Sequence, residues 1–180
     1  MQKTQNLDKG EFEVYDRQLR LWGFEAQARM KESQVLIIGI TNCCTELARH
    51  LVLSGINIKL VAFKSSGSEV AADDYQDEFL LAPDDVGKGK GEVIVQKLKE
   101  MNPFSTISFN QIDNDEAAIR EFMATLKPAA VVFGLSRTPF SEAIKINNLA
   151  REIAAPFYCL NASGLSAFIF SDLATNSFEF

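Results

Sequence analysis

The chain has 180 residues, 47% of them hydrophobic, which fits a single domain with a real core. Its net charge of −6 argues against nucleic acid as the main partner, because neutralising phosphates needs clustered Lys and Arg. No apolar run reaches the ~18 residues of a membrane span, and the first residues lack a signal-peptide core, so we expect a nuclear or cytoplasmic protein with no membrane partner.

Helix-like and strand-like patterns alternate along the chain. Residues 12–32 predict two short helices joined at Gly23, and 35–38 predict a buried strand that leads into a helix. A second strand covers 58–63, and the polar stretch 64–78 predicts a surface loop. The later patterns predict helices at 88–101, 116–127 and 140–154 and strands at 105–111, 129–135, 156–162 and 166–173. This alternation predicts an α/β fold with a Rossmann-like, doubly wound, mostly parallel sheet.

The segment VLIIGITNCCTELARHL, residues 35–51, has the hydropathy of a nucleotide-binding strand, turn and helix but lacks most of the glycines. Aligning the glycine-rich turn from Gly39 places Asn42 at the second glycine and Cys44 at the third. The second glycine normally lets the backbone approach pyrophosphate, so we expect Asn42 to fill that space. The second strand ends at Phe63, where such folds carry an acid for the ribose. These features predict a scaffold that binds no nucleotide here.

The three cysteines, Cys43, Cys44 and Cys159, show no metal spacing, and adjacent cysteines rarely bridge each other. We interpret all three as small buried apolar residues. The single histidine, His50, lies in the helix after the turn and is given no catalytic part. No bound metal is predicted.

The most specific words of the sequence are YDRQLRLWG, residues 15–23. With VLIIGI, ELARHLVLSGI, FLL, DDVGKGK and MNP following in order, the chain resembles the ThiF/MoeB-like adenylation domains of activating enzymes for ubiquitin-like modifiers. It is most similar to the small, non-catalytic subunits of the heterodimeric enzymes. The resemblance implies a ThiF-type adenylation fold. It also allows the residues that active members use for nucleotide chemistry to be compared with the matching residues of this chain.

Active members of that family bind ATP and magnesium and form an acyl-adenylate with the modifier. Their Asn-Arg-Gln-Phe element, whose arginine faces the nucleotide, matches residues 76–79 here, so Asp77 and Glu78 bring two acids that would repel a triphosphate. Lys90 matches the family's phosphate lysine, although a lysine on an exposed helix start needs no function to explain it.

Active members also carry an aspartate for magnesium just after the fourth strand. Here Gly134, Leu135 and Ser136 occupy that place, and none of them can replace it. The resemblance therefore implies a degenerate site, with no ATP or metal bound by this chain itself.

The same resemblance implies a partner: a large catalytic subunit that carries ATP and magnesium and forms the thioester. It further implies that Arg17, in the opening helix, reaches the partner's ATP site in trans, a role that suits the planar fork of a guanidinium. Arg20, one turn further on, either shares that contact or pairs with a carboxylate. Leu19, Leu21 and Trp22 are expected to pack on this domain's own sheet or on the partner.

Three functions stay open at this point. The first is the non-catalytic subunit of an activating enzyme, for SUMO in preference to the neddylation counterpart because of the compact spacing from Gly55 to FLL and the NP after the helix. The second is a nicotinamide-dependent oxidoreductase, which the missing glycines and ribose acid disfavour. The third is a stand-alone pseudoenzyme scaffold. Because the family's small subunits are longer, we expect residues 1–180 to form one inactive domain that is truncated at its C-terminal end.

Overall fold

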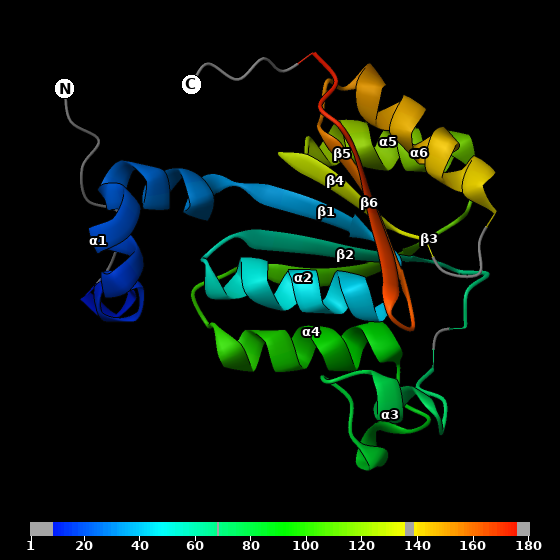
Figure 1. Cartoon of the computed structure of the whole chain (residues 1–180), viewed down its shortest axis with the longest axis horizontal. Helices are drawn as coiled ribbons and strands as arrows, with labels where there is room; N and C mark the ends of the chain where they lie inside the picture. Colours follow the sequence, from blue (N-terminus) through cyan, green and yellow to red (C-terminus); the bar gives the residue numbers. More distant parts are fainter. Residues whose placement is uncertain (1–8, 68, 136–138, 176–180) are drawn as a thin grey trace.

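The structure is a computed structural model that describes residues 9–67, 69–135 and 139–175. Its centre is a six-stranded sheet in the order β3-β2-β1-β4-β5-β6 (Figure 1). Neighbouring strands run parallel except for the last pair, β5 and β6, which is antiparallel. The strands are β1 (Gln34–Ile38), β2 (Asn57–Phe63), β3 (Ile107–Ile112), β4 (Ala130–Gly134), β5 (Phe157–Ser163) and β6 (Ser166–Asp172). The predicted doubly wound, mostly parallel sheet is confirmed.

Helices cover both faces of this sheet. On one face lie α2 and α4, and on the other lie α5 and α6 (Figure 1). The helices are α1 (Lys9–Glu32), α2 (Asn42–Leu53), α3 (Asp74–Asp77), α4 (Lys90–Met101), α5 (Glu116–Leu126) and α6 (Phe140–Glu152), with a 3₁₀ turn at Pro83–Asp85. The central strand β1 is buried on both faces, since Ile37 packs with the α2 and α4 core and Leu36 with the α5 and α6 core. Its continuous apolar run follows from this double covering.

The first helix, α1, bends sharply at Gly23. That residue has φ 80° and ψ 173°, a conformation that glycine adopts readily, so α1 consists of two helical segments, as predicted. The rings of Phe12 and Phe24 lie 5.3 Å apart, whereas residues twelve apart in a straight helix would be about 18 Å apart. The first segment therefore folds back on the second to form an arm beside the sheet (Figure 1).

The stretch 64–78 is more structured than the predicted surface loop. It contains α3, its Glu69 bridges to Gly89, and Val70 and Glu78 are buried. The polar composition of this segment predicted a surface loop. Several of its polar residues instead pack the segment against α2 and α4.

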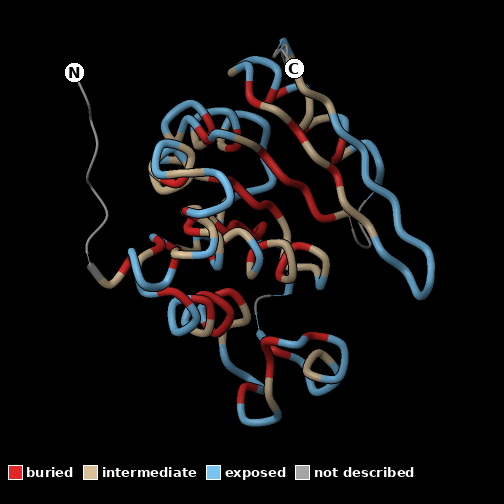
Figure 2. The backbone as a smooth tube through the Cα atoms, turned by 60° about the vertical axis from the view of Figure 1, so that its left-hand side comes forward, coloured by how far each residue is buried: buried red, intermediate tan, exposed pale blue. Residues whose placement is uncertain are grey.

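The hairpin of β5 and β6 forms the outer edge of the sheet. All of β6 up to Ser171 is exposed, and Figure 2 shows the hairpin extending from the body with its tip and most of β6 in pale blue. At its base Arg151 of α6 donates to Asp172 through Nε (2.6 Å) and Nη2 (2.9 Å), and Asn147 donates to the same carboxylate. These bonds fasten the end of β6 to α6.

Candidate functional site

The candidate site lies at the carboxyl ends of β1 and β4. These neighbours are followed by helices on opposite faces of the sheet, and in open α/β folds ligands bind at such a switch point. The two strands approach closely there. Gly39 has a φ of 102°, and a Cβ added to it would lie 3.1 Å from the carbonyl oxygen of Gly134. This turn thus requires glycine at position 39.

Side chains from the start of α2 fill the inner end of this crevice. Thr41 is the N-cap of α2, and its hydroxyl accepts from the Cys44 N–H at 3.3 Å. A Cβ on Gly134 would lie 2.5 Å from Cys44 Sγ and 2.7 Å from Thr41 Oγ1. The alignment that placed Asn42 at the second glycine is corrected here: counted from Gly39, the G-x-G-x-x-G spacing has its second glycine at Thr41 and its third at Cys44. Thr41 and Cys44 occupy the space that Asn42 was predicted to fill.

Asn42 acts at the mouth of the crevice instead. Its side chain is exposed, and its Nδ2 donates to the main-chain carbonyl of Asp77 at 3.0 Å. Since Asp77 is the last residue of α3, this bond draws the segment 74–78 over the start of α2. The prediction that Asn42 fills the turn was wrong, because Asn42 lies one residue beyond the second-glycine position and its side chain reaches outward to a segment 35 residues away.

Asp77 and Glu78 have different surroundings. The Asp77 side chain is exposed, whereas Glu78 is 2% exposed and its Oε2 accepts from Thr45 Oγ1 at 2.6 Å. Burial raises the pKa of the Glu78 carboxyl, although the bond from Thr45 opposes that rise. Glu78 therefore serves mainly to pack its segment onto α2. The repulsion of a triphosphate stays a prediction, and it now concerns the exposed Asp77 more than the buried Glu78.

A glutamine at position 78 is expected to stabilise the fold above acidic pH. Because the pKa of Glu78 is raised above its ordinary value of 4.5, folding takes up a proton, and the free energy of unfolding falls as the pH rises beyond that value. Glu78→Gln removes this loss, and the amide oxygen of the glutamine can still accept from Thr45 Oγ1. We expect a gain of about 1 kcal/mol at pH 8 and little near pH 4, measured by thermal unfolding across that range.

Asp77→Asn is the matched control, because it neutralises the adjacent but exposed acid. It should stay within about 0.5 kcal/mol of the wild type at each pH. A Glu78→Gln variant that is no more stable than the wild type at pH 8 would contradict the burial argument.

Lys90 is the first residue of α4, but it does not lie on an exposed helix start as predicted. Its side chain is 14% exposed, and its Nζ lies 3.1 Å from Asp74 Oδ1. This pair ties α4 to α3. Together with the bonds of Asn42 and Glu78, it holds the segment 74–78 from both α2 and α4.

The other predicted departures lie at the ends of β2 and β4. Phe63 ends β2 and is buried, which leaves no acid at that position. The next residue, Lys64, pairs with Asp113 at 2.8 Å, so a carboxylate does lie near this strand end but is matched by a lysine. Leu135 follows β4 and offers no side-chain oxygen, and Ser136 lies outside the described residues.

Cysteine and histidine supply no reactive group. Cys44 and Cys159 are buried as predicted, whereas Cys43 is only half-buried, which corrects the prediction. Burial raises the pKa of the Cys44 thiol to about 11, which disfavours the reactive thiolate. His50 is exposed on α2. In the part of the chain that the structure describes, no three His, Cys, Asp or Glu side chains are grouped to hold a metal ion.

Arg17 lies on the first segment of the α1 arm, and its side chain is exposed. No hydrogen bond or ion pair joins it to another residue of the described ranges 9–67, 69–135 and 139–175. Arg20 differs, because its Nε pairs with Asp16 at 3.0 Å. The structure thus places Arg20 in an ion pair and leaves the guanidinium of Arg17 available.

The apolar residues of the arm are divided between the interior and the surface. Leu19 is buried, whereas Leu21 is 76% exposed. Trp22 is 37% exposed, and its Nε1 donates to Gln27. Packing on this domain therefore accounts for Leu19 and leaves Leu21 uncovered.

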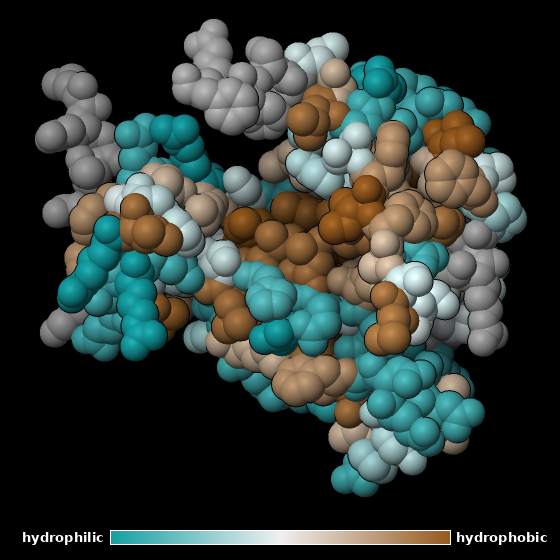
Figure 3. All heavy atoms as spheres, in the orientation of Figure 1, coloured by the Kyte–Doolittle hydropathy of each residue, from teal (hydrophilic) through white to brown (hydrophobic). Residues whose placement is uncertain are grey.

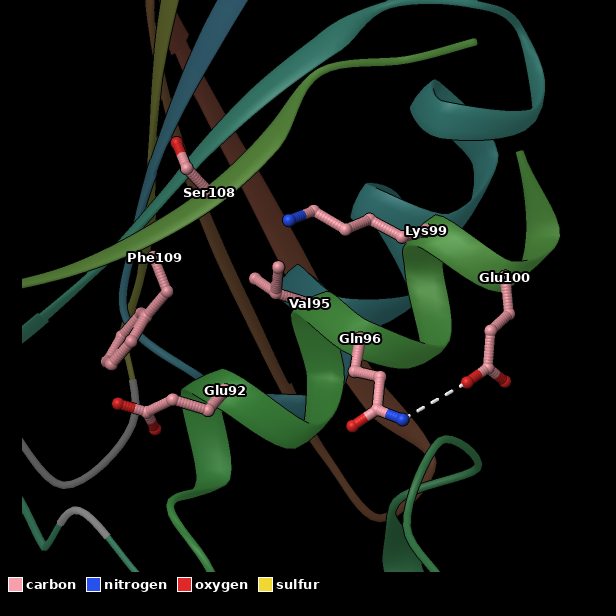
Figure 4. A pocket seen from close by; sticks show the side chains of 7 residues that line it. All are labelled: Glu92, Val95, Gln96, Lys99, Glu100, Ser108 and Phe109. Carbon is pink, nitrogen blue, oxygen red and sulfur yellow. Dashed lines mark hydrogen bonds between the residues drawn. The ribbon is translucent and has the colours of Figure 1, made fainter. Parts of the chain in front are cut away.

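A surface groove lies away from this crevice, between α4 and the edge strand β3 (Figure 4). It encloses about 560 Å³ and is lined by Glu92, Val95, Gln96, Lys99, Glu100, Ser108 and Phe109. Gln96 donates to Glu100 on its own helix, and the charged groups do not converge on a common point. The groove has no arrangement that indicates chemistry. Within the described residues, no helix is both long and apolar enough to cross a bilayer.

The comparisons with known proteins agree with this architecture. Residues 15–162 match the ThiF family. The chain is 32% identical over 174 residues to the DNA damage tolerance protein RHC31 of Saccharomyces cerevisiae, covering 95% of this chain and 47% of that protein. It is 33% identical over 173 residues to SUMO-activating enzyme subunit 1B-1 of Arabidopsis thaliana, covering 93% of this chain and 51% of that protein.

Among solved structures, the crystal structure of PaaA is similar with a TM-score of 0.80 and 22% identity, over 99% of this chain and 59% of that one. At that identity the likeness shows the fold alone. The chain spans about half the length of the curated relatives it matches.

Proposed function

Because this chain belongs to the ThiF family, we propose that it is a non-catalytic subunit of a heterodimeric enzyme that activates the ubiquitin-like modifier SUMO. In this proposal a larger partner subunit binds ATP and magnesium, adenylates the modifier and forms the thioester. The present chain completes the partner's site with Arg17 and holds no nucleotide or metal of its own. The name of the Arabidopsis relative favours SUMO over the neddylation counterpart.

The observation that carries the proposal is the combination of an intact fold with an occupied crevice. Thr41 and Cys44 stand against Gly134, and the segment 74–78 lies over the start of α2. A nucleotide phosphate would have to displace these groups, and the carboxylate of Asp77 would oppose it. A family member with its own site occupied is suited to act through a partner.

The exposure of Arg17 supports a role in trans. A guanidinium that has no partner among the described residues keeps all its donors for another molecule. Its planar fork matches the oxygens of a phosphate, and its charge persists at any physiological pH.

An apolar area on the sheet supports a protein partner. Leu160 and Ile169 lie side by side in the β5 and β6 pair, and Ile169 is 73% exposed. Tyr158 and the α2 residues Leu47 and Leu51 are partly buried around the same core. Figure 3 shows apolar side chains gathered in the middle of this face, between α1, α2 and β6. A surface of this kind is typical of a protein interface.

The experiment that tests the proposal is reconstitution with the large SUMO-activating subunit. We expect the two chains to co-elute in size-exclusion chromatography through an interface of roughly 2,000 Å² or more, and SUMO-dependent ATP–pyrophosphate exchange to require both. Folded chains that elute separately would rule out the subunit function and favour a stand-alone scaffold. The neddylation large subunit serves as the specificity control, and assembly with that subunit in place of the SUMO enzyme's would reassign the modifier.

A further inference from the structure

Both segments of the α1 arm are bonded to the C-terminal end of α2. The last carbonyls of a helix have no partner within it. Here Gln18 Nε2 donates to the carbonyl of Leu53 at 3.1 Å, and Gln27 Nε2 donates to that of Ser54 at 2.9 Å. The two glutamines come from the two segments of the arm, on either side of Gly23. Each segment is thus bonded to the same end of α2.

Gly55 shows how closely the arm is fitted to this end. Its φ of 87° favours glycine by itself. In addition, an added Cβ would lie 2.8 Å from Gln27 Nε2 and 3.0 Å from the phenol ring of Tyr15. Both side chains are buried, and the Tyr15 hydroxyl accepts from Asn102 Nδ2 at 2.7 Å. The arm therefore packs on the backbone of residue 55 with no room to spare.

Gln27 also connects the two segments to each other. While its Nε2 donates to Ser54, its Oε1 accepts from Trp22 Nε1 at 3.0 Å. Trp22 belongs to the first segment and Gln27 to the second, so one fully buried amide bonds both segments and the end of α2. The Lys31–Glu11 ion pair also joins the two segments. Arg17 projects from that first segment, beside Gln18.

We propose that this contact, made by Tyr15, Gln18 and Gln27 on residues 53–55, positions Arg17 for the partner's nucleotide. The inference rests on the proposed function of Arg17. A cation that must meet phosphate oxygens acts best from a rigid support, because a displacement of about 1 Å can cost a hundredfold in rate. Gln27 is accordingly a positioning residue: it touches neither substrate nor nucleotide, and its effect passes through Arg17.

The test is a double-mutant cycle in the reconstituted heterodimer. Gln27→Leu removes both bonds of the amide, and we expect it to lower kcat for SUMO-dependent ATP–pyrophosphate exchange by roughly tenfold or more. In an Arg17→Ala background the same change should cost almost nothing further, because there is no cation left to position. A merely structural residue would slow both backgrounds by the same factor, and that result would overturn the proposal. Gln96→Leu, an exposed glutamine on α4, is the matched control.

The arm itself can be observed in the free chain, independently of activity. Trp22 is the only tryptophan, so its fluorescence reports whether the indole keeps its place on Gln27. We expect Gln27→Leu to shift the emission to the red and to speed amide exchange over residues 9–22, with the sheet still protected. Unchanged emission and exchange would overturn the inference at its structural step.

Two further outcomes keep the proposals separate. If Arg17→Ala alone exchanges at the wild-type rate, the proposed role of Arg17 fails and the positioning role fails with it, even if the fluorescence responds. If Arg17→Ala is slow but Gln27→Leu is as fast as the wild type with a released arm, only the positioning proposal fails. Should Gln27→Leu not fold, Gln18→Met removes a single bond, to Leu53, and is expected to give the same pattern with a smaller loss.

Discussion

Arg17→Ala is expected to leave the heterodimer assembled and to slow SUMO-dependent ATP–pyrophosphate exchange about a hundredfold. A cation that meets charge developing on the phosphates acts mainly on the transition state, and losing one such group typically costs on the order of 3 kcal/mol. Assembly should survive because Arg17 is exposed on the arm and supports no described contact within this chain. Exchange assays on size-exclusion-purified heterodimer measure the rate.

The structure offers two controls for this variant. Arg17→Lys keeps the charge but loses the fork, so it should recover only part of the rate. Arg20→Ala removes an arginine one turn away that is already paired with Asp16, and it should exchange at close to the wild-type rate. An Arg17→Ala heterodimer that exchanges normally would make Arg17 an ordinary surface residue. A variant that fails to assemble would instead assign Arg17 to the interface.

Gly134→Ala is expected to destabilise the chain by about 2 kcal/mol, within the usual range for overpacking. The new methyl would lie 2.5 Å from Cys44 Sγ and 2.7 Å from Thr41 Oγ1, so α2 or β4 must shift. Cys44→Ala in the same chain removes the nearer atom and should restore part of the loss, although that change alone costs stability by leaving a cavity. Chemical denaturation of the two single variants and the double variant gives the coupling.

Gly67→Ala is the matched control, because an added Cβ there has no neighbour within 4 Å. It should leave the free energy of unfolding unchanged or slightly higher. If Gly134→Ala unfolds at the wild-type midpoint, the end of the crevice has room for a methyl group. The view that side chains of α2 fill it would then be wrong.

Much of the fold could be predicted from local patterns. The buried run at 35–38, the apolar run at 129–135 and the helical periodicities between them predicted the alternation of strands and helices. Gly23 predicted the bend of α1, because a residue without Cβ permits the φ of 80° found there. The sequence pattern did not predict the antiparallel direction of β6, because a short apolar strand has the same hydrophobic pattern whichever way it runs in the sheet.

The sequence predicted where the site differs from that of active family members, but it did not predict which residues contact one another there. The sequence by itself determined that acids stand at 77 and 78 and that the turn after Gly39 lacks glycines. Only the tertiary structure decided that Glu78 is buried on Thr45 while the adjacent Asp77 is exposed. Hydropathy periodicity concerns neighbours a few residues apart, whereas that bond joins residues 33 apart that meet only after α2 and the segment 74–78 pack together.

The arm shows the same division. Its helical pattern and its bend follow from residues that are close together in the chain. The place where it docks depends on Gln18 and Gln27 meeting the carbonyls of Leu53 and Ser54, and a glutamine in a sequence does not reveal which carbonyl it will meet. The sequence alone determined the elements because secondary structure depends on local periodicity, and the tertiary structure decided the partners because the unpaired carbonyls at the end of α2 could be reached only by segments that packing brings there.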